Sequence, residues 1–167
     1  MRKSGRMYNI EFDKVYEFTI SASFGDLSQD VVNELLRKGP PNSPFMEKQL
    51  AVWFPEIEHI PAQKGWDHKW KYHGPTHEEE KLKKLLDAKS FTKSGLGFAP
   101  SHMVGAGRKI IKEEAEEHAH LIDYILCDIV EFPYVRIRFI RGADLYTLYP
   151  NFKVSNAKKN REALFGI

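Results

Sequence analysis

The chain has 167 residues, of which 42% are hydrophobic and 29% are charged, and its formal net charge at pH 7 is +2. This composition fits one globular domain and argues against a disordered chain. The single cysteine, Cys127, excludes a disulfide framework, and no apolar run reaches the ~18 residues of a membrane span. The basic start of the chain lacks the apolar core of a signal peptide. We therefore expect a cytoplasmic protein that does not enter a membrane.

The N-terminal part of the chain predicts one strand and two helices. Residues 7–20 place charged residues between apolar ones, a pattern typical of a strand or hairpin arm. Residues 26–39 combine capping residues, an apolar face and a final glycine, and they predict a helix. The proline-rich stretch 39–44 predicts a rigid loop, and 45–54 predict a short helix that stops before a proline.

The middle of the chain predicts an aromatic loop followed by two helices. Residues 61–75 are irregular and rich in aromatic side chains. Residues 76–89 predict a helix, because Thr76 and Glu79 form a capping box with acids in the first turn and lysines after them. A glycine-containing loop follows, and a second helix is expected to begin at Ser101 or Gly105.

The C-terminal part predicts strands. Residues 121–132 are apolar on both faces and indicate a central strand, and 134–141 alternate cleanly. Gly142 and Ala143 can form a turn, after which 144–149 would return as a third strand. Short links between neighbouring strands favour an antiparallel meander.

These elements together predict an α+β fold: a single domain with helices and an antiparallel sheet that ends in a C-terminal β-meander. We divide the domain into five regions. They are an N-terminal strand and helix region (1–60), an aromatic loop (61–75), a helix–loop–helix (76–120), C-terminal antiparallel strands (121–150) and a basic tail (151–167).

Charge is unevenly distributed along the chain. From Glu113 to Glu131 there are seven acids and no lysine or arginine, whereas from Tyr134 to the end there are seven bases and two acids. A basic C-terminal third suggests a polyanionic partner, RNA or DNA.

The expected C-terminal hairpin would concentrate phosphate-binding groups on one face. A turn at 142–143 places Arg136, Arg138, Thr147 and Tyr149 on the face opposite the core. Two guanidinium groups beside a hydroxyl and a phenol on rigid strands form a candidate phosphate-recognition surface. Both arginines would then tolerate replacement without loss of the fold.

A helix followed by an antiparallel meander with "LYTLYP" in its last strand resembles the small metal-independent RNases among bacterial toxins. The resemblance implies a general acid and base, and a cation for the developing charge. His118 or His120 would then move protons at the start of the meander, and Tyr149 completes the candidate catalytic set.

Several histidine patterns raise the question of a metal site. His118-x-His120 is similar to the metal-binding pair of rolling-circle replication nucleases, which lies on a strand, but on a helix the two side chains diverge by about 200°. Glu-x-x-His occurs twice, as two-metal carboxylate bundles require, yet the copy at 56–59 lies between prolines. His68, His73 and His77 have no cysteine nearby to complete a zinc site. We therefore expect neither a bound metal nor another cofactor.

A glycine-containing stretch offers another anion site. Gly105-Ala-Gly107 followed by Arg108 and Lys109 resembles the pyrophosphate-binding loop of N-acetyltransferases of the GNAT family, with His102 in the place of the first basic residue. The resemblance implies phosphate binding by Arg108 and Lys109 at the N-terminus of a helix.

The sequence leads to three alternative functions. The first is a nucleic-acid-binding protein that cleaves phosphodiester bonds as a nuclease, and so a hydrolase, through histidines and arginines on its C-terminal sheet. The second is a non-enzymatic subunit of a larger assembly, such as a phage particle or a ribonucleoprotein. Such a subunit would contact its protein neighbours through the aromatic, proline-rich loops of 39–75. The third is an acetyltransferase similar to the GNAT family.

Overall fold

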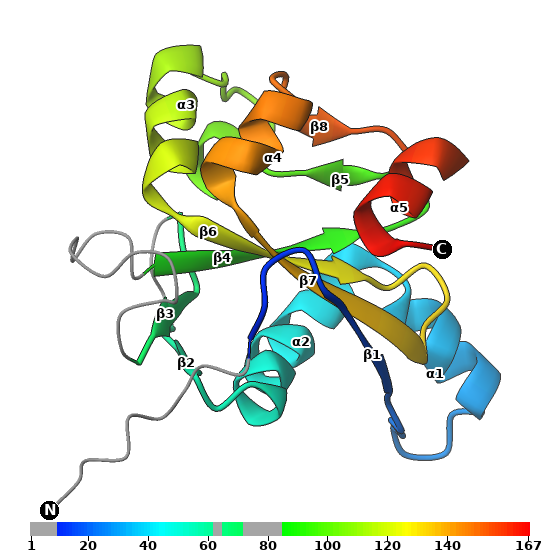
Figure 1. Ribbon diagram of the computed structural model, residues 1–167. Coiled ribbons are helices and arrows are strands. Elements are labelled where there is room, and N and C mark those ends of the chain that lie inside the picture. Colours follow the sequence, from blue (N-terminus) through cyan, green and yellow to red (C-terminus); the bar gives the residue numbers. More distant parts are fainter. Residues whose placement is uncertain (1–9, 62–64, 72–84) are drawn as a thin grey trace, which may run out of the picture.

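The protein is built around one six-stranded sheet. The computed structural model describes residues 10–61, 65–71 and 85–167. The spatial order of the strands is β1-β7-β6-β4-β3-β2 (Figure 1). Their bounds are β1 (Val15–Thr19), β2 (Ile57–His59), β3 (His68–Trp70), β4 (Leu85–Phe91), β6 (Asp123–Asp128) and β7 (Tyr134–Arg141). β4 and β6 run parallel and the other neighbours antiparallel, so the predicted α+β class is confirmed.

Helices cover both faces of this sheet (Figure 1). One face is covered by α1 (Gln29–Leu36) and α2 (Gly39–Trp53). The other face carries α3 (Lys112–Leu121), α4 (Gly142–Leu148) and α5 (Lys158–Phe165). Beside these three helices lie a small second sheet and a short 3-10 helix. They are β5 (Leu96–Gly97) paired with β8 (Lys153–Val154), and η2 (Ser101–Met103).

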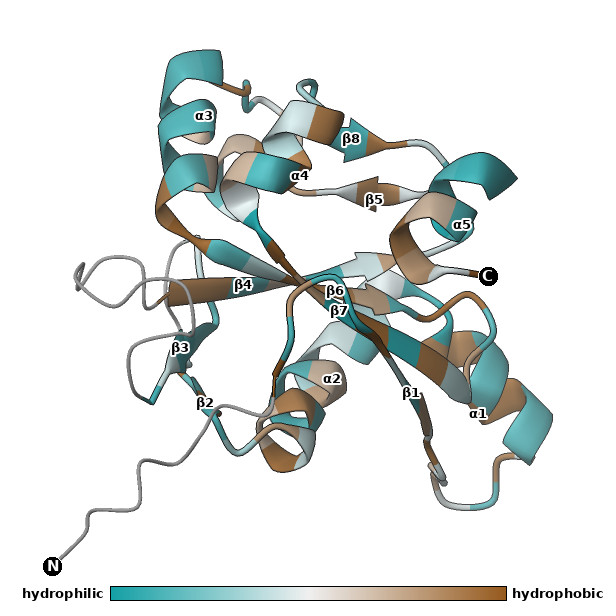
Figure 2. Cartoon of the chain, in the orientation of Figure 1, coloured by the Kyte–Doolittle hydropathy of each residue, from teal (hydrophilic) through white to brown (hydrophobic). Residues whose placement is uncertain are grey.

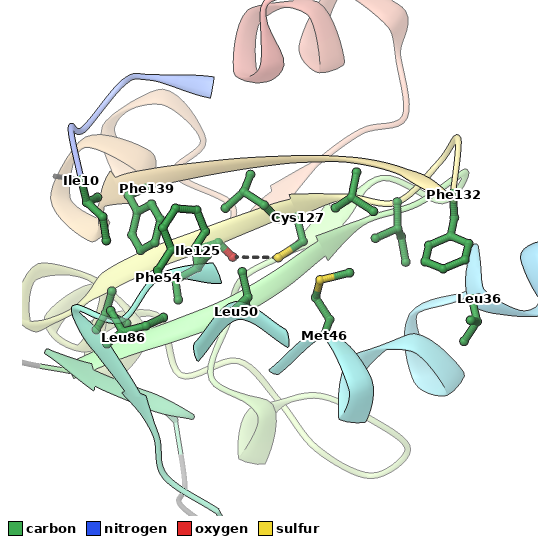
Figure 3. Packing of buried hydrophobic residues seen from close by; sticks show 14 of the residues in the cluster. Ile10, Leu36, Met46, Leu50, Phe54, Leu86, Ile125, Cys127, Phe132 and Phe139 are labelled. Atoms are coloured by element: carbon green, nitrogen blue, oxygen red, sulfur yellow. Dashed lines mark hydrogen bonds between the residues drawn. The ribbon is translucent and has the colours of Figure 1, made fainter. Parts of the chain in front are cut away.

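Each face of the sheet has its own hydrophobic core, because alternate residues of a strand point to opposite sides. On the α2 side, Cys127 lies among the side chains that Figure 3 labels, which include Met46, Leu50, Phe54 and Ile125. Tyr124 and Leu126 belong to the core on the other side. All six residues of β6, Cys127 among them, are buried, which confirms the predicted central strand.

The helix predicted for 26–39 is confirmed as α1. Ser28 caps it, since its Oγ accepts a hydrogen bond from the Val31 amide at 3.4 Å. Val32 and Leu36 enter the core. α3 is hydrophilic over most of its surface, as Figure 2 shows, and the residues that it buries are Ala115 and Ala119.

The proline-rich stretch 39–44 is not the predicted loop but the beginning of α2. Proline is well tolerated in the first turn of a helix, where its missing amide hydrogen would have no partner. The described part of the expected 39–75 loops is largely regular structure as well, because it holds α2, β2 and β3. Some of its aromatic residues pack against the rest of the chain: Trp53 stacks on Phe18 at 4.0 Å and Trp70 is buried, whereas Phe45 is exposed.

The helix predicted for 76–89 is wrong at its C-terminal end. Leu85–Phe91 form β4, between β3 and β6, while 76–84 lie outside the described residues, as do His73 and His77. Because β4 pairs with β3 on one side and with β6 on the other, tertiary pairing outweighs the helical propensity of the lysine- and leucine-rich stretch.

The third strand predicted for 144–149 is also wrong, because these residues lie in α4 and its C-cap. β7 is already paired with β1 on one edge and with β6 on the other, so a returning strand has no free edge to join. Gly142 begins the helix in close contact with α3, where a Cβ atom would lie 1.8 Å from the carbonyl oxygen of Ala119. Any larger residue would push α4 away from α3.

Candidate functional site

The two arginines of the expected phosphate surface share a face, but they bind groups of the protein itself. Arg136 Nη1 lies 3.3 Å from a carboxylate oxygen of buried Asp128 and 3.0 Å from one of Glu131. Arg138 Nη2 lies 2.7 Å from Asp13, and its Nη1 donates to two carbonyl oxygens of α5. Arg136 thus ties β7 to β6, and Arg138 ties β7 to α5 and to Asp13.

The other members of that surface lie elsewhere because α4 replaces the predicted strand. Thr147 Oγ donates to the Ala143 carbonyl oxygen at 2.9 Å, within the helix. Tyr149 is the C-cap of α4, and partial burial raises the pKa of its phenol. The four-residue phosphate surface predicted from the hairpin register is therefore not formed.

His118 and His120 both lie on α3 and do not converge. His118 packs against Gly65, and burial lowers the pKa of its imidazole. His120 Nδ1 donates to the Glu116 carbonyl oxygen at 2.8 Å, and its ring lies 5.7 Å from that of Tyr146. The two imidazoles have separate environments, as the helical phase implies.

The glycine stretch forms a turn rather than the N-terminus of a helix. Gly105 and Gly107 have positive φ angles of 120° and 74°, and α3 begins only at Lys112. The acetyltransferase-like arrangement, in which the glycines lead directly into a helix, is therefore not formed. Arg108 and Lys109 lie on an exposed loop instead.

Sequence reasoning missed a cavity whose lining comes from α2, β2 and β4 and extends to residues of β5 and η2. This acidic cavity, of about 820 Å³, is lined by three carboxylates and one lysine, with His59 and Ser90 among the other lining residues. Glu47 comes from α2, Asp67 directly precedes β3, and Asp87 and Lys89 lie on β4. Asp87 and Lys89 are two residues apart on a strand and therefore share a face.

A buried histidine fixes the orientation of Asp67. His68 Nδ1 lies 2.6 Å from Asp67 Oδ1, and its Nε2 lies 2.6 Å from the carbonyl oxygen of Glu47. Because a carbonyl oxygen only accepts, Nε2 must carry a proton. The same Asp67 oxygen also accepts from the amide of Ala88 at 3.0 Å. One carboxylate oxygen is thus tied to α2 and to β4.

Asp87 is a buried acid with too little compensation. Its residue is 6% exposed, and Lys89 Nζ lies 3.1 Å from Oδ2. That oxygen nevertheless accepts no well-directed hydrogen bond from the described residues. Burial raises the pKa of the Asp87 carboxyl to about 7; Lys89 opposes this shift and neighbouring Asp67 adds to it. Two carboxyl groups, those of Asp67 and Asp87, therefore lie near a single ammonium group, and the charge of one disfavours ionisation of the other.

Glu47 extends the acidic cavity toward β2. Burial is the main cause that raises the pKa of the Glu47 carboxyl, and the negative charge of Asp67 raises it further. His59 Nε2 lies 3.4 Å from Glu47 Oε2 and offers partial compensation. Within the described residues, no three histidine, cysteine, aspartate or glutamate side chains converge as a complete metal shell.

A second cavity, of about 770 Å³, adjoins the first. Its charged lining residues are Lys89, Arg108, Lys109 and Lys153, and no acid lines it. We call it the basic cavity. Lys89, Gly97, Ser101 and Val104 line both cavities. The acidic cavity and the basic cavity thus share part of their lining, including Lys89.

The signal that could have found this site was "LLDAK", an acid and a lysine two residues apart after an apolar pair. Assigning the stretch to a helix placed Asp87 and Lys89 on different sides and hid the pairing.

Comparison with known proteins adds no assignment, since no protein-family model, curated protein or solved structure matches this chain. Among the described residues, no helix is both long enough and apolar enough to cross a bilayer.

Proposed function

We propose that the protein hydrolyses phosphodiester bonds of nucleic acid, with a divalent cation held at Asp67 and Asp87. The observation that carries the proposal is the meeting of an acidic and a basic cavity at one lysine. Phosphodiester substrates are polyanions, and their hydrolysis needs positive charge at the phosphate. The basic cavity supplies attraction for the substrate, and the acidic cavity supplies ligands for a cation.

The arrangement of carboxylates suits Mg²⁺ or Mn²⁺ better than zinc. Mg²⁺ keeps several waters and is commonly bound by one or two carboxylates together with substrate phosphate oxygens. Asp67 and Asp87 provide two such carboxylates, and His68 holds one of them in place. A cation between them would also relieve the repulsion that raises the pKa of Asp87. When bound, such an ion polarises the phosphoryl oxygen and lowers the pKa of water.

Lys89 is the residue we assign to the scissile phosphate. Its side chain is only 17% exposed, its ammonium group lies 3.1 Å from Asp87, and the residue lines both cavities. A fixed ammonium at this point can neutralise the charge that develops on the phosphoryl oxygens. The roles expected for His118, His120, Arg136 and Arg138 are not part of this proposal, because these residues do not line either cavity.

The test is cleavage of labelled single- and double-stranded DNA and RNA with Mg²⁺ or Mn²⁺. We expect Asp67→Asn, Asp87→Asn and Lys89→Met each to lower the cleavage rate by about 100-fold or more. Asp26→Asn, which removes an exposed acid, is the matched control and should keep the wild-type rate. Identical purification of every variant excludes a contaminating nuclease.

Two results would contradict the assignment. One is cleavage that persists at the same rate in excess chelator, which would remove the cation from the proposal. The other is an Asp87→Asn variant that is as active as wild type, which would place the chemistry outside the acidic cavity.

The alternative of a non-enzymatic subunit is favoured by a different surface. Exposed apolar side chains gather on and around α1; they are Phe24, Leu27, Val31, Leu35 and Phe45. Such a patch is typical of contact with another protein. Sedimentation of the purified chain tests this reading, since a protein that stays a monomer at all concentrations would count against self-assembly through the patch.

A further inference from the structure

The basic cavity contains cations that the fold does not neutralise. Arg108 Nη1 donates to the carbonyl oxygens of Ser101 and Val104 at 3.3 and 3.4 Å, which holds the guanidinium group at the cavity. No carboxylate pairs with Arg108, Lys109 or Lys153 within the part of the chain that the structure describes. The contrast is with Arg136 and Arg138, which are paired with acids. The cavity therefore has cations available for an external anion.

The same cavity is also apolar, which a phosphate group alone would not require. Phe152 and Met103 form buried parts of its lining, and Val104 and Ile110 line it while 52% and 38% exposed. A concave apolar lining with a few cationic groups is typical of sites for ligands that have both an apolar and an anionic part. A nucleotide has both parts, a base with apolar faces and a phosphate.

The position of the cavity relates it to the proposed chemistry. Lys89 lines both the acidic and the basic cavity. A phosphate bound at Lys89 therefore has the carboxylates of the acidic cavity on one side and the basic cavity on the other. The nucleotide attached to that phosphate is therefore next to the basic cavity.

We infer that the basic cavity binds one unstacked nucleotide that flanks the scissile phosphate, and that the substrate is single-stranded nucleic acid. This inference rests on the proposed function. A base that enters a cavity of about 770 Å³ has left its stack and its pair, which is least costly in a single strand. Lys89 contacts the scissile phosphate on one side of this nucleotide, Lys109 and Lys153 bind the phosphate on its other side, and the side chains of Val104 and Ile110 contact its base.

The first experiment measures binding of a fluorescent 15-nucleotide single strand and of the matching duplex, in chelator to prevent cleavage. The variant Lys109→Gln/Lys153→Gln removes two cations of the basic cavity. The matched control is Lys158→Gln/Lys159→Gln, which removes two exposed lysines of α5 that line neither cavity. We expect the cavity variant to bind the single strand roughly 3- to 30-fold more weakly, with the salt slope reduced by about 1.4, and the control to bind as wild type does.

The second experiment tests whether a base occupies the cavity. Ile110→Ala shortens an exposed apolar lining residue without changing charge. A single abasic nucleotide is moved stepwise along the strand, and binding to wild type and Ile110→Ala is compared in a double-mutant cycle. We expect one abasic position, adjacent to the cleavage position, to weaken binding to wild type. At that position Ile110→Ala should add no further loss, whereas at all other positions it should weaken binding as it does for the intact strand.

The outcomes separate the inference from the proposed function. If wild type cleaves, but binds duplex and single strand equally and the cavity and control variants behave alike, the nucleotide site is refuted and the nuclease assignment stands. If abasic positions all behave alike, the base contact is refuted. A wild-type protein that neither binds nor cleaves any nucleic acid overturns both.

Discussion

Replacing Asp87 by asparagine should stabilise the protein at alkaline pH, although it removes an ion pair. The Asp87 carboxyl has a pKa near 7 in the folded protein, against an ordinary value of 3.8, because it is buried and lies beside Asp67. Since the folded-state pKa is the higher one, this group favours folding fully below pH 3.8. That contribution is lost as the pH rises toward 7.

The expected gain in stability follows from the same shift in the pKa of Asp87. A pKa moved from 3.8 to about 7 corresponds to roughly 4 kcal/mol between the two protonation states. Asparagine loses the attraction to Lys89, whose partly exposed side chain can be hydrated instead. We therefore expect Asp87→Asn to raise the free energy of unfolding by about 1–3 kcal/mol at pH 8, or roughly 3–10 °C in melting temperature. At pH 5 the gain should be smaller.

The assay is thermal unfolding of both proteins in chelator at pH 5 and pH 8, with Asp26→Asn as an exposed-acid control. The chelator matters because a bound cation would lower the pKa of Asp87 and conceal the effect. An Asp87→Asn variant that is less stable than wild type at pH 8, with no dependence on pH, would refute the reasoning. It would mean that Lys89 compensates the buried charge fully.

Four further results are expected. Mn²⁺ at about 100 times its dissociation constant should stabilise wild type by about 2.7 kcal/mol, and a melting-temperature shift of the same size in Asp67→Asn would contradict a shared site. His68→Leu should lower the free energy of unfolding by about 2–4 kcal/mol in urea titrations, because two buried hydrogen bonds each lose a partner. Arg136→Gln should cost about 1–3 kcal/mol, because a buried aspartate keeps only one of its two arginine partners; a neutral effect would mean that the network is too solvated to matter. Cys127 should react slowly with a thiol reagent in the native protein, and burial raises the pKa of its thiol, so rapid labelling would indicate that β6 opens readily.

Sequence patterns correctly predicted those elements whose local sequence preference agrees with their environment in the folded protein. β6 is buried on both faces, and its four central residues, 124–127, are therefore non-charged and mostly apolar. β7 alternates because its two faces differ. α1 carries its own cap in Ser28. In each case the residues nearest in sequence contain the information that decides the structure.

The elements that were missed depend on partners distant in sequence. Residues 144–149 are rich in leucine and tyrosine, but whether they form a strand depends on a free edge of β7, and β1 occupies that edge. Leu85–Lys89 suit a helix by propensity, but β6 offers them a parallel neighbour. No window of local sequence contains either fact.

The acidic pair could not be predicted for the same reason. Asp67 and Asp87 are brought together by the antiparallel pairing of β3 with β4, in which His68 lies opposite Leu86. Their separation of twenty positions spans residues outside the described part of the chain. A shift of one residue in this register would turn Asp87 to the opposite face of the sheet, and the acidic cavity would no longer form.

Asp128 and Asp87, two of the buried acids among the described residues, differ in how their charge is compensated. Asp128 is surrounded by Arg136 and Arg161, at 3.3 and 2.9 Å, so its charge is neutralised within the fold. Asp87 has one lysine beside it and a second carboxylate against it, and its pKa rises accordingly. A fold that needed only stability would place a neutral or apolar side chain at position 87. The incomplete compensation of Asp87 is the feature on which the proposed cation site rests.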